Sequence, residues 1–146
     1  MASRVRHLRA RVLKALFKLH TRVYEATDGR LGAHLKLPML LLTVTGRKTR
    51  QPRTTPLAYF EDAGGYVVVG SDGGARRDPQ WWLNLRVDPS ATVRVGRRVF
   101  QAKARLAEGT ERARLWERGK QVNPAWSQYQ KHTQRELPVV VLEPIG

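Results

Sequence analysis

Hydrophobic residues recur with a helical period near the start of the chain. Within residues 4–24, six apolar side chains follow one another at spacings of three or four, which places them on one helical face. These residues are Val5, Leu8, Val12, Leu16, Leu19 and Val23. Basic residues fill many of the other positions, and no acidic residue precedes Glu25. The pattern predicts a basic amphipathic helix, whose apolar stripe packs either on the domain body or on an anionic membrane.

Beyond this segment, short apolar runs alternate with turn residues, a pattern typical of β-strands. Six strands are predicted, over residues 39–45, 54–60, 66–69, 91–95, 99–106 and 137–142. Pro56 indicates an edge strand or a bulge, because proline has no N–H for a sheet ladder. The almost wholly apolar run 66–69 indicates a strand buried on both faces. We expect residues 54–60 to pair with 66–69 in one hairpin, and 91–95 with 99–106 in another.

Capping residues mark the helices of the second half. Asp78 is the expected N-cap of a helix that has Pro79 in its first position and ends near Val87. Thr110 is the expected N-cap of a helix that ends near Val122, and a short helix follows Pro124. On strand 99–106, one face is expected to be buried; it comprises Phe100, Ala102, Ala104 and Leu106. The adjacent Trp81 and Trp82 are expected to point about 100° apart into different surroundings.

The connections between most strands are short, which favours an antiparallel sheet that closes into a barrel with helices outside. We therefore expect a single α+β domain spanning residues 1–146. No apolar run reaches the roughly 20 residues that span a bilayer, and no signal peptide is recognisable, so the expected location is cytoplasmic.

Composition narrows the chemistry. The chain has no cysteine, which excludes disulfides and thiol catalysis, and its net charge is +15. Such a charge favours anionic partners, namely nucleic acid, an acidic membrane face, or a phosphorylated or carboxylated cofactor. The four histidines lack metal-ligand spacing, no metal site is expected, and Ser71 lies in no nucleophile elbow. An enzyme of this composition would need a cofactor to supply its reactivity.

The strongest candidate site is a loop between two predicted strands. Residues 46–53 contain four cations, Arg47, Lys48, Arg50 and Arg53, preceded by Gly46. A loop held at both ends can direct several guanidinium and ammonium groups at one anion. The alternative interpretation is a solvated basic turn.

A resemblance to a known family adds to this interpretation. Residues 41–49 (LLTVTGRKT), followed by Gln51, Pro52 and Arg53, resemble the signature loop of the deazaflavin (coenzyme F420)-dependent nitroreductases, a family that also includes quinone reductases. The resemblance continues through residues 66–85 and 124–144. It implies a split β-barrel, monomeric or homodimeric, in which reduced F420 gives a hydride to a quinone, a nitroaromatic or another conjugated acceptor.

The resemblance also implies roles for particular residues. Arg47, Lys48 and Arg53 would hold the acidic tail of the cofactor, in a loop completed by Thr49, Gln51 and Pro52. Beside the ring would lie Val69, Gly70 and Ser71, with Trp81 and Asn84 closing the slot. Trp126 and Tyr129 would line the substrate side, and Ser71 or Tyr129 would orient the substrate or donate a proton.

Three positions depart from the family pattern. Arg50 replaces a residue that is usually small, and Asn123 replaces an aromatic residue beside the substrate. Asp72 stands where the family commonly has lysine and would repel a tail carboxylate, which Arg76 and Arg77 could offset.

Two other hypotheses stay open at this point. One is a nucleic-acid-binding barrel, although the strand 99–106 lacks an aromatic stacking platform on its polar face. The other is a non-catalytic binder or membrane-docked carrier. FMN and FAD are alternative cofactors.

Overall fold

The computed structural model describes residues 37–146. The predicted helix over residues 4–24 lies outside the described residues, and with it the choice between packing on the domain body and contact with a membrane. The described chain contains seven strands, three α-helices and a short 3-10 turn, and no helix within it is long and apolar enough to span a membrane. In chain order these are β1 (Met39–Thr45), β2 (Pro52–Ala58), β3 (Phe60–Asp62), β4 (Gly65–Val69), η2 (Asp72–Gly74), α3 (Gln80–Val87), β5 (Ser90–Val95), β6 (Arg98–Leu106), α4 (Gly109–Val122), α5 (Pro124–Lys131) and β7 (Val139–Pro144).

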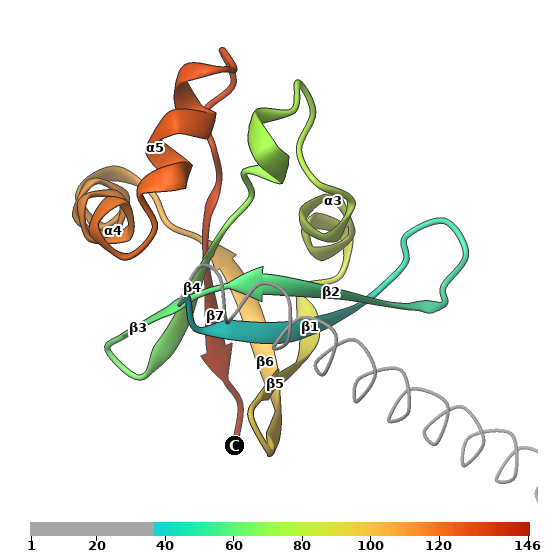
Figure 1. The fold of residues 1–146 in the computed structure, drawn as a ribbon. Helices are drawn as coiled ribbons and strands as arrows, with labels where there is room; N and C mark the ends of the chain where they lie inside the picture. Colours follow the sequence, from blue (N-terminus) through green and yellow to red (C-terminus); the bar gives the residue numbers. More distant parts are fainter. Residues whose placement is uncertain (1–36) are drawn as a thin grey trace, which may run out of the picture.

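All strands belong to one antiparallel sheet with the order β2-β1-β5-β6-β7-β4-β3. The sheet is curled, and β1 and β2 run across β5, β6 and β7 with α3, α4 and α5 on one side (Figure 1). Its two edge strands, β2 and β3, are separated in sequence by Tyr59 alone. A flat seven-stranded sheet could not bring its edges so close, so this short connection requires the curl. The predicted antiparallel sheet with outer helices is confirmed.

The prediction of one strand over residues 54–60 was wrong, because the chain changes partners at Tyr59. The N–H of Tyr59 donates to the carbonyl of Pro38 at 3.1 Å, outside the ladder of strands. Before this residue β2 pairs with β1, and after it β3 pairs with β4. The expected hairpin with residues 66–69 is therefore limited to β3, and the sheet has seven strands rather than six. The predicted hairpin of β5 and β6 is confirmed.

Two hydrophobic clusters fill the described part of the chain, one on each face of β4 and β7. Side chains that alternate along these strands, such as Val68 and Val140, enter a cluster inside the curled sheet with α3. Their neighbours, such as Val67 and Val139, enter a second cluster with α4 and α5. The prediction that residues 66–69 are buried on both faces is thus confirmed.

Both tryptophans of α3 are buried in the same cluster, with ring centroids 6.5 Å apart and a nearly perpendicular arrangement. The expectation that Trp81 and Trp82 occupy separate surroundings was wrong, because both rings belong to the cluster inside the curled sheet. The inward face of β6 is also shorter than predicted. Ala102 and Ala104 are buried, but Leu106, at the end of the strand, is 40% exposed.

Both predicted side-chain N-caps were wrong. The N-cap of α3 is Pro79 and that of α4 is Glu108, and neither forms a capping hydrogen bond through its side chain. The guanidinium of Arg135 instead donates a hydrogen bond to the Asp78 carboxylate, at 2.9 Å. The predicted break at Asn123 is confirmed, and the Asn123 side chain caps α5 by accepting a hydrogen bond from the N–H of Ala125.

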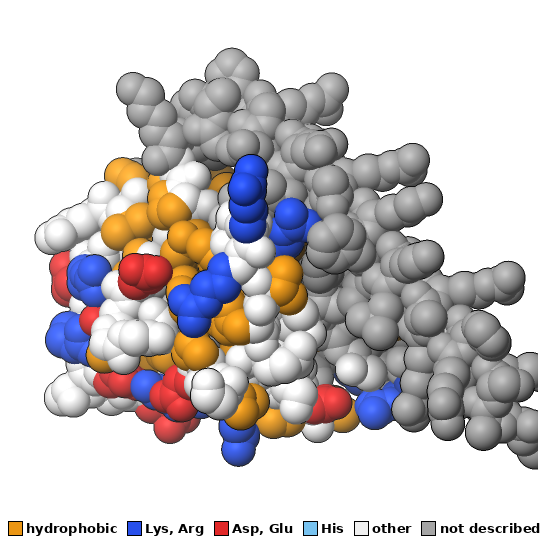
Figure 2. Space-filling view, turned by 90° about the horizontal axis from the view of Figure 1, so that it is seen from below, with side chains coloured by type: hydrophobic (Ala, Val, Ile, Leu, Met, Phe, Trp, Pro, Cys, Tyr) orange, Lys and Arg blue, Asp and Glu red, His pale blue; other side chains and the backbone are white. Residues whose placement is uncertain are grey.

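Hydrophobic side chains also reach the surface on the side of the sheet away from the helices (Figure 2). Three rings are in contact in series within the first cluster: Tyr59 and Tyr66 lie 5.6 Å apart, and Tyr66 and Phe100 lie 5.1 Å apart. Arg98 lies over Phe100, 4.9 Å from the ring centroid. The rings and the stem of this arginine thus pack together at the first cluster.

Asp62 joins the edge strand β3 to α4 and makes the stability of the fold depend on pH. Arg114 donates two hydrogen bonds to its carboxylate, at 2.8 and 3.0 Å, and Arg118 donates one at 2.9 Å. These contacts, with the Arg114 hydrogen bonds as the largest cause, lower the pKa of Asp62 below its usual value. The stabilisation is therefore complete above the unfolded pKa of aspartate, about 3.9, and is lost as the pH falls through the lower folded value.

We expect the free energy of unfolding to fall more steeply on acidification in the natural chain than in the variant Asp62→Asn, which has no charge to lose. Chemical denaturation between pH 7 and pH 3 measures the difference. Parallel curves for the two proteins would contradict a role for this carboxylate.

Candidate functional site

The loop between β1 and β2 is held in one conformation by its own backbone. The N–H of Gly46 donates to the carbonyl of Gln51, and the N–H of Arg50 donates to the carbonyl of Gly46, both at 2.8 Å. The N–H of Gln51 also donates to the Thr49 hydroxyl at 3.3 Å. Since the loop ends are fixed in adjacent strands, the side chains of Arg47, Lys48 and Arg53 start from defined positions.

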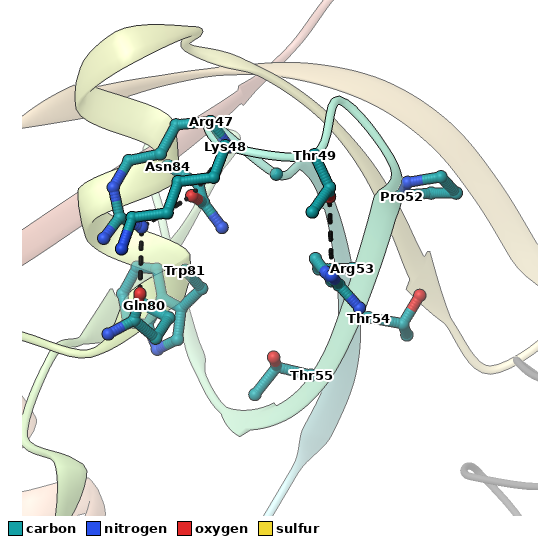
Figure 3. Close-up of a pocket in the computed structure, with 11 residues that line it drawn as sticks. Arg47, Lys48, Thr49, Pro52, Arg53, Thr54, Thr55, Gln80, Trp81 and Asn84 are labelled. Carbon is teal, nitrogen blue, oxygen red and sulfur yellow. Dashed lines mark hydrogen bonds between the residues drawn. The ribbon is translucent and has the colours of Figure 1, made fainter.

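A pocket of about 580 Å³ lies between this loop, β2 and α3 (Figure 3). Figure 3 shows Arg47 and Lys48 at one side of the pocket, Arg53 and Thr55 at the other, and Gln80 and Trp81 on the α3 side. Its lining consists of Gly46, Arg47, Lys48, Thr49, Pro52, Arg53, Thr54, Thr55, Gln80, Trp81 and Asn84. The pocket thus combines cations and hydroxyls with one aromatic side chain, which suits an anionic ligand that also has a flat apolar part.

Arg47 fixes the loop to α3. Its guanidinium donates to the amide oxygens of Gln80 and Asn84, each at 2.9 Å, and its backbone N–H donates to the same oxygen of Asn84 at 3.0 Å. Asn84 is 5% exposed, so the two bonds to its oxygen are partly shielded from bulk water, whereas the bond to Gln80 is exposed. They orient the guanidinium without neutralising it, because both acceptors are uncharged.

The pocket carries positive charge without compensation. Its lining contains no carboxylate, and within residues 37–146 none of Arg47, Lys48 and Arg53 forms an ion pair. Other basic residues among 37–146 do form ion pairs, for example Arg114 with Asp62 and Arg135 with Asp78. Arg53 is directed by a hydrogen bond to the Thr49 hydroxyl, at 3.4 Å. A cluster of unpaired cations at a preformed pocket favours binding of an anion such as a phosphodiester or a polycarboxylate.

The structure brings together most of the residues predicted to bind a cofactor. Those that line the pocket are Arg47, Lys48, Thr49, Pro52, Arg53, Trp81 and Asn84. Gln51 helps to close the loop through its backbone, but it is not part of the lining. Arg76 and Arg77 are exposed in the segment before α3 and are also outside the lining.

Residues 69–71 comprise the last residue of β4 and the two residues that connect it to η2. The Val69 side chain packs in the second cluster, with α4 and α5. Gly70 lies close to the rings of Pro138 and Pro79, so a Cβ built at this position would come within 2.6 Å of the former. Ser71 is 9% exposed, and its carbonyl accepts a hydrogen bond from Arg135. None of the three lines the pocket, and their roles stay predictions.

The residues predicted to line the substrate side gather on α5. Trp126 is 3% exposed and packs against Phe60 and Gly119, while Tyr129 is half-buried beside the second cluster. Asn123 is 9% exposed, and its amide oxygen caps the helix. None of these residues lines the pocket, so their contact with a substrate stays a prediction.

Sequence reasoning missed Thr54, Thr55 and Gln80 as lining residues, and it gave Arg135 no role. The pairing of β2 with β1 explains the threonines. The strand that follows the basic loop pairs back along β1, which places its first residues, including Thr54 and Thr55, at the pocket. Gln80 follows from helical spacing, since it lies four positions before Asn84 on the same face of α3.

Known proteins resemble this chain along most of its length. Residues 16–144 match the family model of F420H(2)-dependent quinone reductases. An F420H(2)-dependent quinone reductase of Mycobacterium tuberculosis is 40% identical over 132 residues, which cover 87% of this chain and 89% of the relative.

Two solved structures match at the level of the fold. One, described as an F420-H2 dependent reductase, has a TM-score of 0.67 and 36% identity over 73% of this chain and 94% of its own. The other, described as a domain-swapped dimer, has a TM-score of 0.68 and 32% identity over 90% of this chain and 98% of its own. The curled sheet is therefore the split barrel that the resemblance implied.

Proposed function

The chain belongs to the F420H(2)-dependent quinone reductase family, and we propose that its basic pocket holds the acidic tail of coenzyme F420. The protein is an oxidoreductase that uses reduced F420, and the acceptor supported by its relatives is a quinone. The observation that carries the assignment of the pocket is the uncompensated set of Arg47, Lys48 and Arg53 around a cavity of about 580 Å³. The cofactor has a phosphodiester and a glutamate tail, which this donor set fits.

When bound, the reduced deazaflavin supplies the hydride. The contribution of the chain is to bind and to orient. Arg47 is fixed by Gln80 and Asn84 and so presents its remaining donors to an anion, while Thr49 directs Arg53 toward the same space. Trp81 provides a buried aromatic wall at the inner side of the pocket. No metal-binding cluster is found in the described part of the chain.

Ser71 and Tyr129 are the residues proposed to orient the acceptor or to supply a proton. Support for their pairing comes from the contact between η2, directly after Ser71, and α5: a Cβ at Gly74 would come within 2.9 Å of the Tyr129 carbonyl. Trp126 and Asn123 belong to the same helix and would shape the acceptor side. Nitroaromatic and other conjugated acceptors remain part of the proposal, since a hydride acceptor needs mainly a flat conjugated group at this position.

A titration with the oxidised cofactor tests the function. We expect the fluorescence of F420 to change saturably with a dissociation constant in the micromolar range or below, and FMN and FAD to bind more weakly. A second measurement follows oxidation of reduced F420 by menadione, a soluble quinone. A dissociation constant no better than millimolar at low salt, or tighter binding of FMN, would overturn the assignment.

The proposal includes partners beyond the acceptor. A homodimer is supported by the relative described as a domain-swapped dimer, and sedimentation of the full chain measures it. Contact of residues 4–24 with an anionic membrane rests on their basic amphipathic pattern. Equal sedimentation of the full chain and of residues 25–146 with anionic vesicles would exclude that contact.

A further inference from the structure

Arg135 is outside the pocket lining and binds the segment 70–78 through its guanidinium. It lies between α5 and β7, and its side chain is 14% exposed. Its guanidinium donates four hydrogen bonds, all to residues 70–78. Nε donates to the carbonyl of Ala75 at 2.8 Å, Nη2 to that of Ser71 at 2.9 Å, and Nη1 to both the carbonyl of Gly70 at 3.0 Å and the carboxylate of Asp78 at 2.9 Å.

The segment that it holds has an unusual backbone. Asp72, Gly73 and Gly74 follow one another with φ values of 42°, 63° and 84°. Two short-range backbone bonds support this turn, from the N–H of Gly74 to the carbonyl of Ser71 and from the N–H of Ala75 to the carbonyl of Asp72. Asp72 is strained at such a φ, whereas the two glycines adopt it freely but lose the most conformational entropy when the turn is ordered, so the turn needs support from outside. The guanidinium therefore supplies the fixed points that the segment lacks.

The segment 70–78 connects the end of strand β4 to the start of α3, which forms one wall of the pocket. Gly70 follows β4, and Asp78 precedes Pro79, the N-cap of α3. Nη1 of Arg135 bridges these two ends directly. The first residues of α3, Gln80 and Trp81, then line the pocket, and Gln80 accepts a hydrogen bond from Arg47. Displacement of Asp78 would move this end of the helix relative to the basic loop.

We propose that Arg135 is a positioning residue for the F420 pocket, which acts through residues 70–78 and the start of α3 without touching the pocket itself. The inference rests on the proposed function of the pocket. Arg135 is suited to the task because its planar fork reaches acceptors in several directions, whereas the single ammonium of a lysine reaches fewer. Gln130 on α5 in turn holds Arg135, since its amide donates to the Arg135 carbonyl at 2.8 Å and accepts from the N–H of Leu137 at 3.0 Å.

Arg112 provides a matched control. Its side chain is 19% exposed, its Nη2 donates to the carbonyl of Leu137 at 2.8 Å, and it forms an ion pair with Glu136. It thus holds the same connection between α5 and β7, but it has no hydrogen bond to residues 70–78. A loss of general stability should follow from either substitution, whereas a loss of pocket geometry should follow only from substitution of Arg135.

The test compares Arg135→Gln, Arg135→Lys and Arg112→Gln in the full chain. We expect Arg135→Gln to speed amide hydrogen exchange in residues 71–77 and to raise the dissociation constant for oxidised F420 at least tenfold. Arg135→Lys should give a smaller change of both, and Arg112→Gln should leave binding within twofold at a comparable loss of melting temperature. If Arg135→Gln does not fold, Arg135→Lys is judged by the same two measurements.

Two results would overturn the proposal. One is unchanged affinity for F420 in an Arg135 variant whose segment 71–77 exchanges faster, since the segment would then be independent of the pocket. The other is an equal loss of affinity in Arg112→Gln, which would reduce Arg135 to a general contributor to stability. Failure of the natural chain to bind F420 would instead reject the proposed function, and the exchange measurement would still report whether Arg135 holds the segment.

Discussion

Replacing Arg47 and Lys48 together by glutamine is expected to weaken binding of F420 by at least about 30-fold. A charge-assisted hydrogen bond contributes about 1–3 kcal/mol, and each 1.4 kcal/mol changes a dissociation constant about tenfold. The effect of Arg47 has a second source, since its guanidinium joins the basic loop to Gln80 and Asn84 on α3. Because the two positions are adjacent, their effects need not add, and the single variants should be measured beside the double variant.

The matched control is the double variant Arg97→Gln and Lys103→Gln. Both control residues are exposed, lie outside the pocket lining and form no ion pair within the described residues, and the change of net charge is the same. Fluorescence titration at low and moderate salt measures the dissociation constants. Equal losses in the two double variants would mean that the overall charge of the protein, rather than the pocket, attracts the cofactor.

The substitution Gly74→Ala is expected to destabilise the fold by about 2–4 kcal/mol and to lower activity. Two costs combine at this position. The backbone has a φ of 84°, which strains any residue with a Cβ, and the new Cβ would lie 2.9 Å from the carbonyl oxygen of Tyr129. A backbone oxygen of α5 cannot move aside as a flexible side chain can, so η2 or α5 must shift. Tyr129, proposed to face the acceptor, would be displaced.

The control variant Gly73→Ala separates the backbone strain from the steric clash. Its φ is 63°, and a Cβ there would meet nothing within 4 Å, so Gly73→Ala should cost only the strain, about 1–2 kcal/mol. Chemical denaturation and the kcat for menadione reduction should be measured for both variants. If Gly73→Ala and Gly74→Ala lose the same stability and activity, the contact between η2 and Tyr129 has no part in either.

Local patterns predicted the elements of this fold well, and they were less informative about pairing. The apolar run of β1 and the alternation of β6 were sufficient to place those strands. The break at Tyr59 was not visible, because residues 54–60 keep a strand-like composition through the change of partner. The failure at Asp78 has a similar cause: its local sequence is that of a helix cap, but Arg135, 57 positions away, offers its carboxylate a charged partner.

In the candidate site, too, the sequence revealed local features but not contacts between distant segments. The basic loop could be recognised because its cations are adjacent in the sequence and because they belong to the resembling signature. Thr54, Thr55 and Gln80 come to line the pocket only when β2 and α3 are placed beside that loop. Arg135 gave no signal at all, since its acceptors are mostly backbone carbonyls, which the identity of a residue does not reveal.

The order of the strands also has a consequence for the behaviour of the protein in solution. The outermost strands of a sheet normally attract strands of other molecules, which leads to aggregation. Here one of them, β2, carries Pro52 and Pro56, and the other, β3, has only three residues. Proline has no N–H to offer to an incoming strand, and three residues give such a strand little to pair with. Both margins of the sheet are therefore poor templates for intermolecular β-structure.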